Sequence, residues 1–336
     1  LYTDNCSAVT AVLISSNVTG TDCNWTATYT YSVKDACNNA AANAVVVYTG
    51  GDTQVPALTG TIPGGISGNL CKAAAPTAPS VAAIAGLYTD NCSAVTATLI
   101  SSSVTGTDCS WTATYTYSVK DACNNAAANA VVVYTGGDTQ APLVTGILTP
   151  ASIEGCSLGA APTAAVTVAQ LEVLAGSITI SDACTPDISL VVTHADVING
   201  TCPIVINRTY TITDACNNSS TISHIIQIDD SQAPAITICP PAVNFEGCSV
   251  ASITGLTYSS IPKTITAGLF ASAGGAANDV CGITLYSYVD TQGGTCPITV
   301  TRSFTLSDAC GNIATCMQTI TVTDTQWPVI STCPAN

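Results

Sequence analysis

Charged residues are scarce in this chain, and what is missing excludes several classes of protein. Only 8% of the 336 residues are charged, and 21 acidic against 6 basic side chains give a formal net charge of −15. Nucleic-acid surfaces need clustered lysine and arginine, so that class is excluded. Long hydrophobic runs are missing too, because Thr, Ser, Asn and Gly interrupt every apolar run well before the ~18 residues of a membrane-spanning helix. The sequence therefore predicts neither nucleic-acid binding nor membrane insertion.

Side chains for catalysis are also few. The two histidines, His194 and His224, lie in different strand-like segments, and the only glutamates are Glu154, Glu172 and Glu246. A hydrolytic site needs a nucleophile, a base and an orienting acid that converge, and no such set clusters or repeats in this sequence. We therefore expect no enzymatic activity.

Cysteine, in contrast, is abundant. The chain has 18 cysteines and lacks the Cys-x-x-Cys spacing that zinc sites commonly use. So many thiols without metal-binding spacing are typical of disulfide-bonded proteins in oxidising surroundings. The sequence thus predicts a secreted or cell-surface, extracellular protein. No signal-like segment follows Leu1, so we expect any secretion signal to be removed or to lie upstream.

The chain consists of repeats. Residues 1–56 match residues 87–142 with substitutions only at positions 12, 17, 24 and 55. Two further copies share the signatures Asp-Ala-Cys-(Asn/Gly)-Asn and Asp-(Thr/Ser)-Gln-x-Pro. These signatures begin at Asp35, Asp121, Asp214 and Asp308, and at Asp52, Asp138, Asp230 and Asp324, respectively. Periods of 86 to 94 residues are the size of small domains.

The repeats divide the chain into five expected parts. Residues 1–53 would be the C-terminal part of one module, and full modules would span 54–139, 140–231 and 232–325. Residues 326–336 would be a linker and the first strand of a following module. We refer to the four larger parts as the first to fourth repeats.

Alternation of apolar and polar residues predicts strands in each repeat. Between Cys23 and Asp35, apolar side chains occupy every second position: Trp25, Ala27, Tyr29, Tyr31 and Val33. This period of two is typical of a strand with one buried face. Asp-Ala-Cys-Asn-Asn is turn chemistry, and the apolar residues after it predict a returning strand. Short helical turns are expected in segments such as VAQLEVLAG and ITAGLFASAGG. Together these features indicate an all-β fold of tandem, disulfide-stapled immunoglobulin-like β-sandwich modules in an elongated array.

Two longer segments carry a family resemblance. RTYTITDACNNSSTISHIIQIDDSQAPAITICP and TRSFTLSDACGNIATCMQTITVTDTQWPVISTCP resemble the hyalin-repeat (HYR) type of immunoglobulin-like module, in the tandem form found in large secreted and surface-attached bacterial proteins. The first two repeats depart from that pattern, because they lack the Cys-Pro and Ala-Thr-Cys ends and have alanine-rich strands. The resemblance implies adhesion or structural extension, not catalysis, and identifies no ligand.

Cysteines occur at four equivalent places in the repeats. We name them pre-helix cysteines (Cys71, Cys156, Cys248), loop cysteines in Asp-x-Cys (Cys6, Cys92, Cys184, Cys281), strand cysteines (Cys23, Cys109, Cys202, Cys296) and turn cysteines in Asp-Ala-Cys (Cys37, Cys123, Cys216, Cys310). The strand and turn cysteines of one repeat always lie 14 residues apart. A strand of that length spans roughly 40 Å, so its two ends cannot share a bond.

We therefore expect loop cysteines to pair with turn cysteines at one end of each module, and pre-helix with strand cysteines at the other. The expected bonds are Cys6–Cys37, Cys92–Cys123, Cys184–Cys216, Cys281–Cys310, Cys71–Cys109, Cys156–Cys202 and Cys248–Cys296. Cys239 and Cys316 occur together in the fourth repeat, which predicts a bond between them. Cys23 and Cys333 would find no partner in this stretch of chain.

Aspartates form the strongest candidate site. If each module is entered at its loop end, the linker aspartate meets the aspartates of the Asp-x-Cys loop and the Asp-Ala-Cys turn. The expected sets are Asp52, Asp90 and Asp121; Asp138, Asp182 and Asp214; and Asp230, Asp279 and Asp308. Ca²⁺ takes about six to eight oxygen ligands, so such sets suit it. The alternative, favoured because the sequence has no Asp-x-Asp-x-Asp run, is that each aspartate only caps its own turn.

These features predict a structural segment of an extracellular fibre, stalk or matrix protein that mediates surface extension or adhesion. The alternative is an adhesin module whose loops bind a surface glycan or a protein receptor. Near identity of the first two repeats favours the structural function, because duplication adds reach whereas a receptor site needs one specialised module. The expected partners are further copies of the module. They would lie in a continuing chain, which we favour, or in neighbouring chains that accept a donated terminal strand.

Overall fold

The computed structural model describes residues 1–332 and is built mainly of β-strands. The chain forms two compact units: residues 1–141, 182–186 and 214–218 make the first, and the remaining described residues make the second. The expected all-β fold of tandem, disulfide-linked immunoglobulin-like modules is confirmed. Within residues 1–332, no helix has the length and hydropathy that crossing a bilayer requires.

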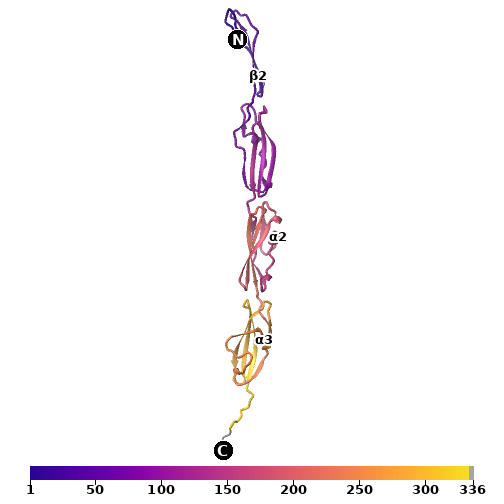
Figure 1. Cartoon of the computed structure of the whole chain (residues 1–336), viewed down its shortest axis with the longest axis vertical. Helices are drawn as coiled ribbons and strands as arrows, with labels where there is room; N and C mark the ends of the chain where they lie inside the picture. The colour runs from indigo at the N-terminus through magenta and orange to yellow at the C-terminus, as the bar shows by residue number, and fades with distance from the viewer. Residues whose placement is uncertain (333–336) are drawn as a thin grey trace. The chain divides into compact units, whose positions relative to one another are not determined.

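In the first unit, the first repeat forms a three-stranded antiparallel meander, drawn in indigo in Figure 1. Its strands are β1 (Thr10–Thr21), β2 (Asn24–Lys34) and β3 (Ala44–Gly50). The central strand pairs Ala27 with Val18 on one side and with Tyr48 on the other. Strand β1 is exposed along its whole length, and most of β2 is only partly buried.

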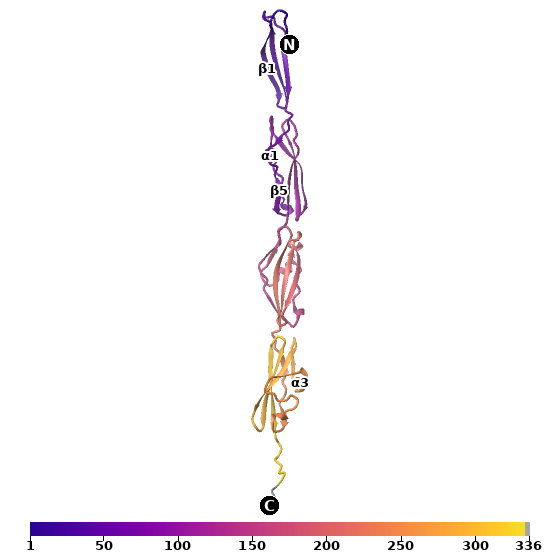
Figure 2. The same cartoon turned by 60° about the vertical axis from the view of Figure 1, so that its left-hand side comes forward.

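The second repeat, also in the first unit, forms two sheets that share a core; Figure 2 labels its α1 and β5. The four-stranded sheet has the order β5-β9-β8-β7, in which β5 runs parallel to β9 and the other pairs are antiparallel. The two-stranded sheet pairs β4 with β6. The elements are β4 (Ala57–Leu58), β5 (Gly64–Asn69), η1 (Lys72–Ala74), α1 (Val81–Ala85), β6 (Tyr88–Thr89), β7 (Thr96–Thr107), β8 (Ser110–Lys120) and β9 (Ala130–Gly137).

The second repeat differs from the first because it has a segment, which includes Leu70 and Pro76, that covers its strand β8. The Trp111 indole N–H donates to the Leu70 carbonyl at 2.8 Å, and the Tyr115 hydroxyl donates to the Pro76 carbonyl at 2.7 Å. Trp111 is 1% exposed, whereas the equivalent Trp25 is 36% exposed. Because the two strands have almost the same sequence, the difference in burial comes from the segment that packs over β8.

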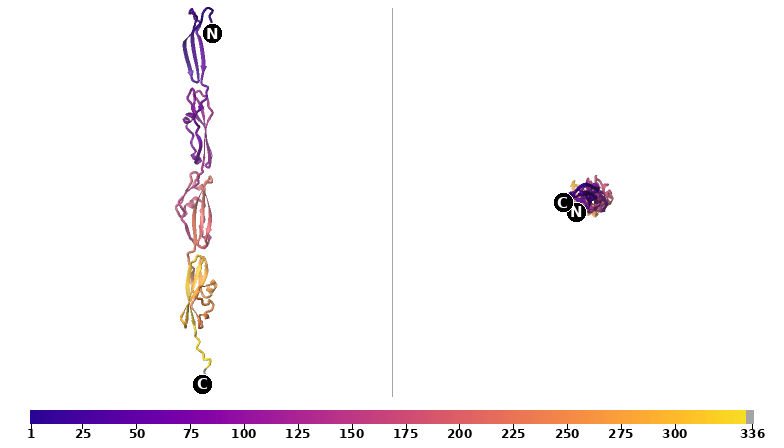
Figure 3. Two further views of the ribbon diagram at one scale, coloured as in Figure 1. Left: turned by 90° about the vertical axis from the view of Figure 1, so that its left-hand side faces the viewer. Right: turned by 90° about the horizontal axis from the view of Figure 1, so that it is seen from above.

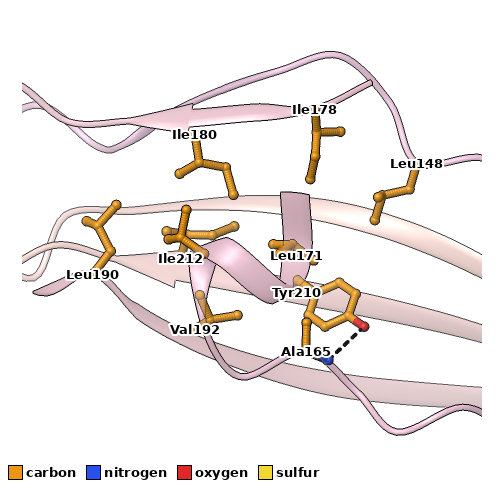
Figure 4. Close-up of a cluster of buried hydrophobic side chains, with 10 residues drawn as sticks. Leu148, Ala165, Leu171, Ile178, Ile180, Leu190, Val192, Tyr210 and Ile212 are labelled. Atoms are coloured by element: carbon orange, nitrogen blue, oxygen red, sulfur yellow. Dashed lines mark hydrogen bonds between the residues drawn. The ribbon is translucent and has the colours of Figure 1, made fainter. Parts of the chain in front are cut away.

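The third repeat supplies the first sandwich of the second unit. Its four-stranded sheet has the order β11-β15-β14-β13, with β11 parallel to β15, and β10 pairs with β12. Leu171, Tyr210 and Ile212 lie in its core, where the Ala165 N–H donates to the Tyr210 hydroxyl at 3.3 Å (Figure 4). The elements are β10 (Leu143–Thr145), β11 (Ala151–Glu154), η2 (Leu158–Ala160), α2 (Val168–Glu172), β12 (Thr179–Ser181), η3 (Asp187–Ser189), β13 (Val191–Asn199), β14 (Ile204–Thr213) and β15 (Ser219–Asp229).

The fourth repeat supplies the second sandwich of this unit, in orange and yellow in Figure 3. Its larger sheet has the order β17-β22-β21-β20-β18, with β17 parallel to β22, and β16 pairs with β19. The elements are β16 (Ala235–Ile238), β17 (Val243–Glu246), η4 (Val250–Ser252), β18 (Lys263–Ile265), α3 (Ala267–Ser272), β19 (Ala276–Asn278), β20 (Ile283–Gly293), β21 (Ile298–Asp308) and β22 (Ile313–Thr323).

Each α-helix is a short element with a hydroxyl cap at its start. The side chains of Ser80, Thr167 and Thr266 accept hydrogen bonds from N–H groups three residues later, at 3.1, 3.2 and 3.2 Å. Each helix buries one or two apolar residues in the core of its own sandwich. The helical turns expected in the third and fourth repeats therefore form.

Two glycines with the same local sequence make a matched test of this packing. A Cβ added at Gly136 would lie 2.4 Å from a ring carbon of Trp111, and one added at Gly50 would lie 2.4 Å from the same carbon of Trp25. The exposed Trp25 ring can move aside, whereas the buried Trp111 ring is held by its neighbours. We expect Gly136→Ala to lower the free energy of unfolding by ~1 to 3 kcal/mol and Gly50→Ala to cost clearly less. Urea denaturation followed by tryptophan fluorescence measures both, and equal costs would contradict the difference in packing.

Candidate functional site

Six disulfides link the described chain, and five of them join successive repeats. These five connect cysteines 100 to 125 residues apart, which exceeds the repeat period. Strand cysteines bond to the turn cysteine of the next repeat: Cys23–Cys123, Cys109–Cys216 and Cys202–Cys310. Pre-helix cysteines bond to the loop cysteine of the next repeat: Cys71–Cys184 and Cys156–Cys281. The sixth bond, Cys239–Cys316, lies within the fourth repeat.

These bonds correct the pairing expected within single repeats. Seven expected pairs are absent from the described residues: Cys6–Cys37, Cys92–Cys123, Cys184–Cys216, Cys281–Cys310, Cys71–Cys109, Cys156–Cys202 and Cys248–Cys296. The reason is that the cysteine nearest to each end of a long strand belongs to a neighbouring repeat. Cys23, for which no partner was expected, bonds to Cys123, with 5.1 Å between the two Cα atoms. Cys333 lies outside the described residues.

Five cysteines form no disulfide within residues 1–332 and are exposed: Cys6, Cys37, Cys92, Cys248 and Cys296. The Cys248 thiol lies 3.4 Å from a carboxylate oxygen of Asp324, and this hydrogen bond raises the pKa of Cys248. Cys92 is exposed but loses some hydration to its neighbours, and this loss, together with the charges of Asp52 and Asp90, raises the pKa of Cys92. Both thiols are therefore less easily ionised than an ordinary cysteine.

The Asp-Ala-Cys-Asn-Asn turn is built around its first side chain. Asp121 Oδ1 accepts from the N–H groups of Cys123 and Asn125, each at 2.8 Å, and Asp121 Oδ2 accepts from the Asn125 amide at 2.8 Å. Asn124 adopts a positive φ of 68°, which asparagine tolerates better than most residues. The same bonds recur at Asp214 and Asp308. The motif thus holds its cysteine in a fixed turn.

The Asp-x-Cys loop is capped in a similar way and contacts the turn. Asp90 Oδ1 accepts from the N–H groups of Cys92 and Ser93, each at 3.0 Å. The Ser93 hydroxyl in turn accepts from the Ala122 N–H in the turn at 3.2 Å. Asp182 and Asp279 cap their own loops with the same pair of bonds.

The linker aspartates lie against these loops and turns. Asp52, Asp138 and Asp230 are 9%, 4% and 4% exposed. Their backbone carbonyls accept from the amides of the turn asparagines that follow, Asn125, Asn218 and Asn312, at 3.2, 3.5 and 2.7 Å. Oδ1 of each linker aspartate accepts from an N–H two residues later, whereas Oδ2 has no hydrogen-bond partner within residues 1–332. A buried, unpartnered carboxylate oxygen is costly, so these atoms call for a cation or a proton.

Each linker aspartate defines a junction with the acids next to it. At the first junction, one carboxylate oxygen each of Asp52, Asp90 and Asp121 lie within 4.8 Å of one another, and Oδ2 of Asp90 is also buried without a partner. The expected convergence of these three side chains is thus present in the structure. Because the cluster consists of oxygen atoms alone, its chemistry suits a hard divalent cation.

The second and third junctions are less complete. Asp138 and Asp214 approach each other beside Cys216, and Asp230 and Asp279 approach each other beside Cys281. Both sulfurs are in disulfides and offer no thiolate ligand. Asp182 and Asp308 stay outside these close clusters, although their charges act on the linker aspartates.

At the third junction, the pKa values of Asp230 and Asp308 shift in opposite directions. Burial raises the pKa of Asp230, and the charges of Asp279 and Asp308 add to that rise. Burial also acts to raise the pKa of Asp308, but hydrogen bonds from Asn312 and Cys310 outweigh it and lower the pKa. The fold therefore disfavours the ionised form of Asp230 and favours the ionised form of Asp308. At the second junction, burial likewise raises the pKa of Asp138.

The two histidines lie on strands that flank β14 and serve packing. His224 is buried, its Nε2 lies 3.1 Å from the Thr149 carbonyl oxygen, and burial lowers its pKa. His194 packs against the ring of Tyr210, with 6.2 Å between ring centroids. Neither arrangement is a nucleophile and base pair.

Comparisons with known proteins identify no family for this chain. No family model matches the sequence, and no curated protein matches it. Among solved structures, protocadherin gamma B2 extracellular cadherin domains 3–6 match with a TM-score of 0.34 at 9% identity, covering 96% of this chain and 93% of that one. Drosophila N-cadherin EC1-4 matches with a TM-score of 0.27 at 11% identity, covering 96% and 94%. At these values the likeness says nothing about activity or ligands.

The opposite pKa shifts of Asp230 and Asp308 predict opposite effects of the same substitution. Without divalent cations, Asp230→Asn should raise the melting temperature by a few degrees at pH 7, because a carboxylate with a raised pKa costs stability as the pH rises above 3.8. Asp308→Asn should lower it, because a carboxylate with a lowered pKa adds stability that is lost only as the pH falls below 3.8. Calorimetry in chelator from pH 3 to 7 measures both; shifts of the same sign would contradict this electrostatic account.

Proposed function

We propose that this chain is a structural segment of an extracellular fibre, stalk or matrix protein, which mediates surface extension or adhesion and carries tension along its length. The proposed modules are 54–139, 140–231 and 232–325, with part of a module at 1–53 and a linker and strand at 326–336. One observation carries the proposal: five disulfides bond each repeat to the next. Structural disulfides on this scale are typical of oxidising compartments, which supports a secreted or cell-surface location.

The strand and turn cysteines connect the repeats into one continuous covalent path. Cys123 and Cys109 lie at the two ends of β8; Cys123 is bonded to Cys23 of the first repeat and Cys109 to Cys216 of the third. Cys216 and Cys202 lie in the same way at the ends of β14, and Cys202 is bonded to Cys310. The path therefore crosses the second and third repeats through β8 and β14 alone.

The mechanical consequence is that unfolding cannot lengthen these repeats. The path through each uses only the 14 residues between its turn and strand cysteines, and most of these are already extended in a strand. The other residues of each 86- to 94-residue period lie in closed loops that bear no load once the path is taut. A chain bonded in this way keeps its length under a pull that unfolds an ordinary tandem array.

Single-molecule stretching tests the proposed function. In the oxidised chain, pulled from its two ends, we expect the second and third repeats to give no unfolding steps. After reduction, each should give a step of roughly 300 Å, because a released residue adds about 3.3–3.6 Å. The double variant Cys109→Ser/Cys216→Ser should restore part of this extension in oxidised protein. Cys239→Ser/Cys316→Ser, which removes a bond within one repeat, is the matched control. Full-length steps in the oxidised parent would refute the proposal.

We further propose that the junctions bind Ca²⁺. The first junction would hold the ion through carboxylate oxygens of Asp52, Asp90 and Asp121, with water completing the about six to eight ligands that Ca²⁺ takes. The unpartnered Oδ2 atoms of Asp52 and Asp90 support this site, since turn capping alone leaves them without a partner. At the other two junctions, Asp138 with Asp214 and Asp230 with Asp279 supply fewer close carboxylates. A bound cation would relieve the repulsion there and fasten the linker to the following loops.

Calcium titration of the full oxidised chain tests these sites. Isothermal titration calorimetry should show up to three sites and a melting temperature that rises with Ca²⁺ concentration, as expected for a ligand that binds the folded state. Asp52→Asn should remove one site. Asp35→Asn is the matched control, because Asp35 caps the same kind of turn without belonging to a close acidic cluster. No calcium uptake at millimolar concentration would leave turn capping and a shared proton as the function of these acids.

The alternative function is a module that binds a surface glycan or a protein receptor. Such a site would need exposed aromatic side chains gathered near the loops. In the second and third repeats, Trp111, Tyr117 and Tyr210 are instead buried in the sandwich cores. The observations therefore favour the mechanical function.

A further inference from the structure

A cavity of about 220 Å³ lies inside the fourth repeat, bordered by β17, β21 and β22 of the larger sheet, by residues 253–256 and by α3. The core of this repeat consists of two separate apolar clusters, and the cavity is lined from both: Ile253 and Ile320 belong to one, and Leu256 packs against the other. Leu269 of α3 lines the cavity and is 45% exposed. The cavity therefore opens to solvent beside this helix.

Two buried polar side chains interrupt the apolar wall. Arg302 and Gln318 face each other across β21 and β22, line the cavity and are 3% and 4% exposed. Gln318 Nε2 donates to the Pro241 carbonyl at 2.8 Å, and Arg302 donates through Nε and Nη2. Gln318 Oε1 and Arg302 Nη1 make no hydrogen bond within residues 1–332, and neither atom is fully enclosed. The cavity thus offers one acceptor and one donor, and both call for a partner.

The third repeat shows that the free Nη1 is a particular feature of the fourth. Arg208 faces His224 across β14 and β15, as Arg302 faces Gln318, and it binds an aspartate through Nε and Nη2 in the same way. Its Nη1, however, donates to the Pro162 carbonyl at 2.9 Å. The covering segment of the third repeat therefore takes up the donor that the fourth repeat leaves open to its cavity.

The charges at the cavity favour a neutral ligand. Asp290 accepts from Nε and Nη2 of Arg302, each at 2.8 Å, and its side chain is fully buried, so the two charges already balance. A carboxylate ligand would add an unpaired negative charge and would place an acceptor against Gln318 Oε1, which is also an acceptor. A neutral group that accepts from Arg302 and donates to Gln318 satisfies both open atoms. A primary amide has this pattern of donor and acceptor.

We propose that the fourth repeat binds a small neutral molecule with an apolar body and a polar head, such as a primary amide, that accepts from Arg302 Nη1 and donates to Gln318 Oε1. The apolar body would lie against Ile253, Leu256 and Ile320. In another protein a cavity of about 150 Å³ holds benzene, so the cavity in the fourth repeat has room for a ring with a short polar head. The site lies within one repeat and is independent of the proposed structural function.

Calorimetric titration of the full oxidised chain with benzamide tests the proposal. Benzamide should bind at one site per chain at millimolar concentration or below. Acetophenone has nearly the same shape and keeps the acceptor but lacks the donor, so it should bind roughly tenfold more weakly, the effect of one lost hydrogen bond. Benzoate, which has a charged head, should bind more weakly still.

Three variants assign the binding to this cavity. Gln318→Met keeps the length of the side chain but removes the acceptor, so it should weaken benzamide roughly tenfold and leave acetophenone nearly unchanged. Pro241 is exposed, so water can replace the hydrogen bond that its carbonyl loses. Gln292→Met makes the same change at an exposed glutamine of β20 outside the cavity and is the matched control. Ala273→Leu enlarges a side chain that lines the cavity and should abolish the binding of both compounds.

Three results would overturn the proposal: no binding of benzamide at millimolar concentration, tighter binding of benzoate than of benzamide, or an affinity for benzamide that neither Gln318→Met nor Ala273→Leu changes. Acetophenone also reports on the fold of Gln318→Met, because its unchanged affinity shows that the cavity is intact. The stretching and calcium experiments depend on other residues, so their outcomes do not decide this one.

Discussion

The length of the long strand is the constraint on which the other features depend. Its turn and strand cysteines are separated by 14 residues and cannot reach each other, so every bond at either end must go elsewhere. In the described chain, Cys23, Cys109 and Cys202 each reach the turn of the following repeat. The long strands of the second and third repeats are thereby bonded through disulfides at both ends to the neighbouring repeats, and the remainder of each sandwich packs around its strand.

The junction acids follow from the same arrangement. A turn cysteine can meet the preceding repeat only if the Asp-Ala-Cys turn lies against the linker, and this contact buries Asp52, Asp138 and Asp230. The turn asparagine binds the linker carbonyl, yet the linker carboxylate keeps an oxygen without a partner. The contact between turn and linker would thus hold both a disulfide and a cation. The disulfide brings the turn to the linker, and the cation would offset the negative charge of the aspartates that are brought together there.

The first two repeats show how far packing, not local sequence, decides exposure. Trp25 and Trp111 lie in nearly identical strands, but only Trp111 is covered, by the segment that supplies the Leu70 carbonyl. The Asp-x-Cys loops and Asp-Ala-Cys turns behave differently. Asp4 beside the free Cys6 and Asp182 beside the bonded Cys184 make similar cap bonds, so these bonds do not depend on the disulfide. The turns are therefore set by bonds between residues two to four apart, and the cores by contacts over tens of residues.

Sequence by itself determined the β-strand pattern between Cys23 and Asp35, the capped turns, the size of the repeats and the meeting of Asp52, Asp90 and Asp121. These follow from side-chain alternation and turn chemistry, which act between neighbours in the chain. Sequence also predicted the Cys239–Cys316 bond, which the structure contains, but only the tertiary structure decided which cysteines bond between repeats. Cys123 had candidate partners both in its own repeat and in others. The 14-residue spacing excluded only Cys109. The choice of Cys23, 100 residues away, depended on which end of the preceding repeat lies opposite the turn. That arrangement involves two repeats at once, and no periodicity within one repeat records it.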